Sequence, residues 1–73
     1  MNRLPVISGR DFVRAMAKLG FALDRQKGSH LILFRADPPT TLSVPDHHEL
    51  DRGTLRSLIR QAGISPAEFS QLL

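Results

Sequence analysis

Three segments of β-type sequence are joined by two very short links, and the shortness of these links limits the possible folds. The segments cover residues 21–26, 30–36 and 40–44, and the links are Lys27-Gly28-Ser29 and Asp37-Pro38-Pro39. Links this short make hairpins between antiparallel strands, whereas a parallel crossover needs about a dozen residues or more. We therefore predict a three-stranded antiparallel meander, with the Pro-Pro pair ending its second strand.

Helical patterns flank these segments on both sides. Residues 8–19 and 51–63 have apolar side chains at helical spacing, and residues 65–73 begin with a strong helix-start signal. The resulting order of helix, three strands, helix and short helix indicates an α+β fold with both main helices on one face of the sheet. It is also the order of a double-stranded-RNA-binding domain. The predicted N-terminal caps are Ser8 with Asp11, Asp51, and Ser65 with Glu68.

The middle strand, residues 30–36, is apolar on both faces. Ile32 and Phe34 alternate with Leu31 and Leu33, so either set could be the buried one. A chain of 73 residues is a single domain, and its helices can cover only one face of the sheet. The second face therefore needs another cover, either the C-terminal segment or another protein.

Several classes of site and location are excluded or disfavoured by composition. The chain has no cysteine, which rules out disulfides, a thiolate nucleophile and zinc–thiolate sites and fits a reducing compartment. No metal-ligand spacing and no glycine-rich nucleotide-binding motif is present, so we expect no metal and no small-molecule cofactor. The four consecutive apolar-type residues at 4–7 are too few for a signal peptide or a spanning helix. We expect a cytoplasmic protein with no membrane role.

The charge points to an anionic partner. Ten Lys and Arg residues face seven Asp and Glu residues, giving a formal charge of +3, and eight of the ten cations are arginine. Arginine pairs well with phosphate, while the absence of Trp and Tyr argues against a platform that stacks bases. Nucleic acid contacted through phosphates and 2′-hydroxyls is the favoured partner. The alternative is a mildly basic surface without a nucleic-acid role.

Three sequence elements together resemble the HicA-type toxins, small mRNA interferases of toxin–antitoxin pairs. They are Gly-Ser-His at residues 28–30, Val-Pro-x-His at residues 44–47 and Gly-Thr-Leu-Arg-Ser at residues 53–57. They occur in the family's order and spacing, and the resemblance extends from Leu4 to Leu73. It implies a double-stranded-RNA-binding-like fold, ribosome-independent cleavage of mRNA, and a HicB-type antitoxin that covers the active site.

The resemblance carries the family's catalytic histidine, which follows Gly-Ser or Gly-Gly, onto His30. Many relatives have a second histidine next, where this chain has Leu31. His47 matches the histidine of the Val-Pro-x-His element and is either an RNA-contacting residue or an ordinary loop residue.

A physical argument for His30 stands beside the resemblance. RNA carries its own nucleophile, the 2′-hydroxyl, so cleavage needs only proton transfer and charge stabilisation, which an imidazole can supply near neutral pH without a metal. The expected products are a cyclic phosphate and a 5′-hydroxyl. The second proton-transfer group stays open among Lys27, His47 and water. The candidate phosphate-binding residues are Lys27, Gly28, Ser29, His47, Arg52, Gly53, Thr54 and Arg56.

Two other readings remain. Taken by itself, His30 is better explained as a strand-start histidine bonded to backbone. The chain would then be a non-catalytic RNA- or protein-binding module of the same fold, or an adaptor whose two-faced strand docks a partner.

Overall fold

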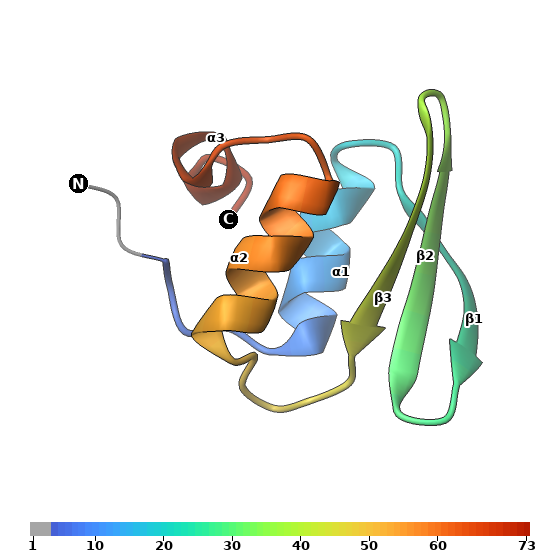
Figure 1. Ribbon diagram of the computed structural model, residues 1–73, viewed down its shortest axis with the longest axis horizontal. Coiled ribbons are helices and arrows are strands. Elements are labelled where there is room, and N and C mark those ends of the chain that lie inside the picture. Colours follow the sequence, from blue (N-terminus) through green and yellow to red (C-terminus); the bar gives the residue numbers. More distant parts are fainter. Residues whose placement is uncertain (1–3) are drawn as a thin grey trace.

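The computed structural model describes residues 4–73 and confirms the predicted α+β fold (Figure 1). Each strand begins and ends within one residue of its predicted segment. Both main helices are shorter than predicted, because Ser8 and Asp51 are caps outside the helices and residues 18–20 and 62–63 form turns. The elements are α1 (Gly9–Ala17), β1 (Ala22–Lys27), β2 (His30–Ala36), β3 (Pro39–Pro45), α2 (Arg52–Gln61) and α3 (Pro66–Ser70).

The three strands form one antiparallel sheet in the order β1-β2-β3, as the short links require. Gly28 and Ser29 alone separate β1 from β2, and Lys27 faces His30 across the hairpin. Gly28 has φ 59° while Ser29 has a negative φ, the pattern of a turn with glycine at its first central position. This turn sets the register that places His30 at the first position of β2.

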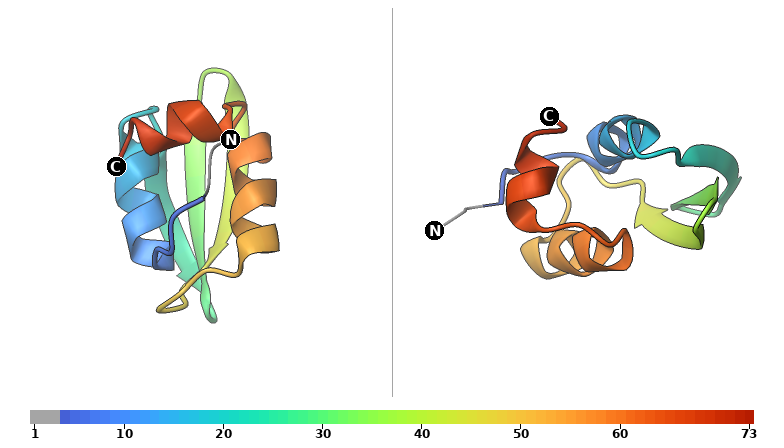
Figure 2. Two further views of the ribbon diagram at one scale, coloured as in Figure 1. Left: turned by 90° about the vertical axis from the view of Figure 1, so that its left-hand side faces the viewer. Right: turned by 90° about the horizontal axis from the view of Figure 1, so that it is seen from above.

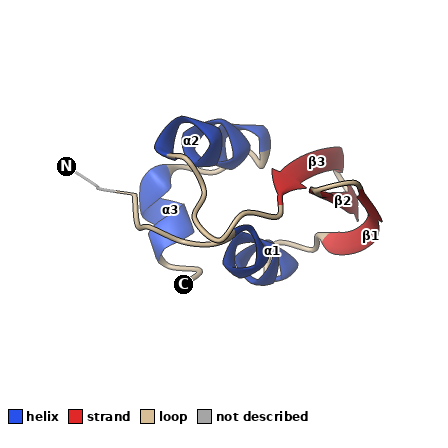
Figure 3. Cartoon of the chain, turned by 90° about the horizontal axis from the view of Figure 1, so that it is seen from below, coloured by secondary structure: helices blue, strands red, loops and turns tan. Residues whose placement is uncertain are grey.

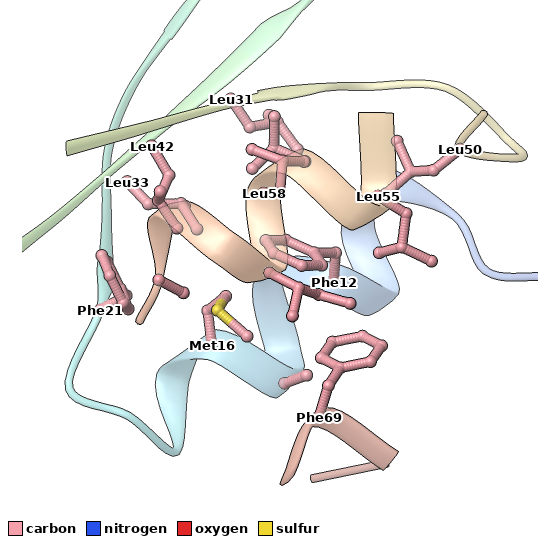
Figure 4. Close-up of a cluster of buried hydrophobic side chains, with 14 residues drawn as sticks. Phe12, Met16, Phe21, Leu31, Leu33, Leu42, Leu50, Leu55, Leu58 and Phe69 are labelled. Atoms are coloured by element: carbon pink, nitrogen blue, oxygen red, sulfur yellow. The ribbon is translucent and has the colours of Figure 1, made fainter. Parts of the chain in front are cut away.

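Both α1 and α2 pack on the same face of the sheet (Figures 2 and 3). The core between the layers takes its β2 contribution from Leu31 and Leu33, which are 3% and 0% exposed (Figure 4). The alternate side chains of β2 point outward, and Phe34 is 46% exposed. The buried face of β2 is thus the Leu31–Leu33 face, and the outer face of the sheet carries His30, Ile32 and Phe34.

The C-terminal helix α3 packs on the helical layer and leaves the outer face of the sheet uncovered (Figures 1 and 4). Its Phe69 is fully buried, and the ring centroids of Phe69 and Phe12 lie 5.6 Å apart. Of the two covers predicted for the second apolar face, the C-terminal segment is therefore excluded.

The predicted helix caps are all present. Ser8 with Asp11 and Ser65 with Glu68 each form a reciprocal capping box, and Asp51 caps α2. Hydrogen bonds from the Ser8 side chain and backbone, together with the nearby Arg14, lower the pKa of Asp11. The backbone N–H of Ser65, with its side chain, lowers the pKa of Glu68 in the same way. Over residues 4–73, no helix has the length and apolar character needed to cross a membrane.

Candidate functional site

One edge of the molecule gathers the β1–β2 turn, the loop after β3, and the N-terminal ends of α1 and α2 (lower edge in Figure 1). The predicted site residues all fall on this edge or within one turn of it. The β1–β2 turn and the start of α2 lie toward its two ends, with the start of α1 between them (Figures 1 and 3). The sequence elements at residues 28–30, 44–47 and 53–57 are therefore brought to one side of the fold.

His30 is an exposed residue at the sheet end of this edge. Its Cα pairs with that of Lys27 on β1 and with that of Pro45 on β3. Directly opposite residues of antiparallel strands point to the same face, so the Lys27 side chain emerges beside the imidazole on the outer face. The strand-start histidine is thus presented to solvent with a cation as its neighbour.

The Gly28-Ser29 turn offers backbone donors next to His30. Among residues 4–73, no protein acceptor pairs with the N–H of Gly28 or of Ser29. The turn is held by the Gln26 side chain, whose Nε2 donates to the Gly28 carbonyl at 3.1 Å. Adjacent unpaired N–H groups in a turn suit an anion such as a phosphate oxygen.

The segment after β3 is fastened both to this turn and to helix α1. The Asp46 N–H donates to the Ser29 carbonyl at 2.7 Å, which prolongs the β2–β3 ladder by one residue. The Gly9 N–H donates to the His47 carbonyl at 2.9 Å. A Cβ at Gly9 would overlap the Pro45 carbonyl oxygen, so the start of α1 lies directly against this segment. The backbone of His47 is fixed, while its side chain stays exposed.

An ion pair that the sequence did not indicate lies at the same place. Arg10 Nε and Nη2 donate to the two carboxylate oxygens of Asp46 at 3.1 and 3.0 Å. The partners are 36 residues apart in sequence, so no local pattern announces the pair. Asp46 stands at the unspecified position of the Val-Pro-x-His element, so that element did not single it out.

The start of α2 differs from the β1–β2 turn as an anion site. The N–H groups of Gly53 and Thr54 already donate to Asp51 Oδ2, at 3.1 and 3.3 Å. The sequence pattern predicted that these two N–H groups bind phosphate, but the acidic side chain of Asp51 already caps them. A phosphate would have to displace this carboxylate. Arg52 and Arg56 remain exposed cations on the first turns of this helix.

The surface around His30 is open, whereas a cleft of about 150 Å³ at the start of α2 is lined by Arg52, Asp51 and Leu50 among others. A cleft of about 400 Å³ lies between α1 and the C-terminal residues, lined by Arg14, Lys18 and Leu72 among others, and His30 is not part of it. Over residues 4–73, no three His, Asp or Glu side chains gather in a way that could hold a metal ion. An exposed edge with cations and free N–H groups is accessible to a polymer.

These features define a small basic α+β domain with an exposed histidine at a tight turn. The family model described as the HicA toxin of bacterial toxin–antitoxin systems matches residues 9–64. The chain therefore belongs to the HicA toxin family and is a toxin-domain member of a toxin–antitoxin system. A search of curated proteins found no match.

Proposed function

We propose that this protein is a metal-independent endoribonuclease that cleaves mRNA, with His30 as general acid/base. The observation that carries the proposal is the exposed imidazole at the start of β2, with Lys27 as its cross-strand neighbour and the free N–H groups of Gly28 and Ser29 before it. Membership of the HicA toxin family supports the choice of RNA as substrate.

The reaction follows from what these groups can do. His30 takes the proton from a 2′-hydroxyl, whose oxygen attacks the adjacent phosphorus, and the bond from phosphorus to the 5′-oxygen breaks. The leaving 5′-oxygen receives a proton, so the products are a 2′,3′-cyclic phosphate and a 5′-hydroxyl. The transition state gains negative charge on its phosphoryl oxygens, and the N–H groups of Gly28 and Ser29 stabilise that charge by donating to those oxygens.

Lys27 is the best placed of the groups that could act opposite His30. It is the direct partner of His30 across the hairpin, whereas His47 lies two residues beyond the strand that borders His30. Both Lys27 and His47 are exposed. We assign Lys27 to the leaving oxygen, as a proton donor or as the cation that stabilises it, and leave His47 and Arg52 with Arg56 as RNA contacts.

A HicB-type antitoxin is the proposed protein partner. The outer face of the sheet exposes Phe34 and partly exposes Ile32 on the same strand and face as His30. A partner that buries this apolar surface would lie across the imidazole as well. Neutralisation would then follow from covering the site.

Expression of the wild type, His30→Ala and His48→Ala tests the enzyme assignment, with growth and RNA integrity followed together. His48 is an exposed loop residue outside the proposed site and serves as the matched control. We expect RNA cleavage and growth arrest from the wild type and His48→Ala and neither from His30→Ala. Cleavage by purified protein should persist in EDTA and leave cyclic-phosphate ends.

Equal cleavage by wild type and His30→Ala would rule out His30 as the acid/base. Intact RNA in both cases, despite folded protein, would favour the alternative of a non-catalytic RNA- or protein-binding module.

A further inference from the structure

The Arg10–Asp46 ion pair occupies the stretch of edge between the β1–β2 turn and the start of α2. Arg10 is in the first turn of α1, and Asp46 is bonded through its backbone to Ser29, the residue before His30. We propose that Arg10 is an RNA-binding residue that holds a phosphate flanking the scissile one. This inference rests on the proposed function, because it assumes that RNA lies on this edge.

The position of Arg10 is fixed by a backbone contact of the residue before it and by contacts of its own side chain. The preceding residue, Gly9, bonds to the His47 carbonyl, and the guanidinium is held by both oxygens of Asp46. An isolated surface arginine loses side-chain entropy when it binds a ligand, and this cost commonly cancels its contribution. Anchoring by Asp46 removes part of that cost before RNA arrives.

The guanidinium keeps donors for a second anion. Of its five N–H groups, one on Nε and one on Nη2 are used by Asp46. The edge formed by Nη1 and Nη2 has no acceptor among residues 4–73, and the Arg10 side chain is 65% exposed. A phosphate can therefore be bound by two parallel hydrogen bonds on the edge that Asp46 does not use.

The side of the sheet on which Arg10 lies indicates which phosphate of the RNA it binds. His30 and Lys27 emerge on the outer face, whereas Asp46 turns toward α1 to meet Arg10 on the helical side. Arg10 is therefore not beside the imidazole, and it contacts a neighbouring phosphate of a strand that passes around this edge. The consequence is that Arg10 contributes to affinity for RNA and not to the chemical step.

The test measures binding of a fluorescent single-stranded RNA oligonucleotide to His30→Ala protein, as a function of salt, with further substitutions in that background. Arg10→Ala should weaken binding about five- to tenfold at low salt and lower the slope of log affinity against log salt by about 0.7, the value for one phosphate on a single strand. Arg60→Ala is the matched control, since Arg60 is an exposed arginine in the last turn of α2, away from this edge.

Asp46→Asn separates an RNA contact from a structural clamp. If Arg10 binds phosphate, Asp46→Asn keeps one oxygen that accepts from the guanidinium and removes the negative charge beside the phosphate, so affinity stays unchanged or rises, whereas Arg10→Ala lowers it. If the pair serves only to join α1 to the loop, both substitutions lower stability and affinity together. Thermal unfolding of each variant shows whether a loss of RNA affinity comes from a loss of stability.

Equal affinities and salt slopes for Arg10→Ala and Arg60→Ala would overturn the inference while leaving the proposed cleavage intact. Failure of the His30→Ala protein to bind RNA would overturn it as well. Loss of binding on Arg10→Ala in a protein that never cleaves RNA would support Arg10 as a contact and reject only the enzyme assignment.

Discussion

The N–H of Gly9 donates to the carbonyl of His47 at 2.9 Å, and this contact joins the start of α1 to the segment that pairs with His30. Glycine permits it, because a side chain at position 9 would collide with the Pro45 carbonyl oxygen. The first helix and the edge that carries His30 are therefore not independent parts of the fold.

Gly9→Ala should consequently disturb both stability and the site. The backbone must move to admit the methyl group, which we expect to cost about 1–3 kcal/mol of unfolding free energy. In a domain of this size that corresponds to a fall in Tm on the order of 4–8 °C for each kcal/mol. Thermal unfolding and an RNA-cleavage assay measure the two effects.

Gly53→Ala is the matched control for Gly9→Ala. Gly53 also lies in the first turn of a helix, but a Cβ there meets only the end of the Asp51 side chain, at 3.2 Å. We expect a change within about 0.5 kcal/mol. Equal losses for the two variants would show that the close approach at Gly9 is unimportant.

Lys27→Ala should lower the rate of RNA cleavage with little change in stability. Its side chain is the nearest cation to His30 by strand register and is exposed. Loss of one stabilising group at the reacting phosphate commonly costs about 10²-fold in kcat. Single-turnover cleavage at saturating protein separates this effect from weaker RNA binding.

Lys18→Ala is the comparison for Lys27→Ala, because Lys18 is an exposed lysine that donates to the Leu72 carbonyl, away from the site. Identical cleavage rates for the two variants would show that Lys27 takes no part in the chemical step.

Truncation of two phenylalanines should have opposite consequences. Phe69 is fully buried against Phe12, and Phe69→Ala should cost about 3–5 kcal/mol, a large part of the stability of so small a domain. Phe34→Ala, on the outer face, should leave the unfolding free energy nearly unchanged and weaken binding to the proposed HicB-type antitoxin. Urea unfolding and calorimetric titration with the antitoxin distinguish the two roles. Unchanged affinity of Phe34→Ala for the antitoxin would show that the antitoxin does not bind this face.

The capping carboxylates should contribute to stability in a pH-dependent way. The pKa values of Asp11 and Glu68 are lowered from their ordinary values of 3.8 and 4.5 by hydrogen bonds from Ser8 and Ser65. Since the folded state favours the charged forms, their stabilisation is complete above the ordinary pKa and is lost as the pH falls through the lowered one.

The double variant Asp11→Asn, Glu68→Gln should therefore differ most from the wild type at neutral pH, and the gap should close in acid below the ordinary pKa values. Tm measured from pH 7 down to about pH 2 follows this directly. Parallel curves over the whole range would contradict the role of the two carboxylates.

Local sequence was sufficient for the features that depend on neighbouring residues. The capping boxes at Ser8 and Ser65 are built within four residues, and the Gly28-Ser29 turn fixes the hairpin register by itself. The exposed position of His30 follows from that turn. Element ends were less well predicted, because a cap such as Asp51 continues the helical pattern without being helical.

Tertiary structure decided what depends on residues far apart in the chain. Leu31 and Phe34 are both apolar, and only the packing of α1 and α2 on one face determined that Leu31 is buried and Phe34 exposed. The docking of Phe69 on Phe12 placed α3 on the helices and left the outer face open.

The pairing of Arg10 with Asp46 was likewise beyond sequence, since its partners meet only when α1 lies against the end of β3. The turn, the caps and the exposed histidine after the turn could be predicted from local sequence, because each depends on contacts within a few residues. The folded chain alone decided which surface surrounds that histidine, because that surface is assembled from segments that packing brings together.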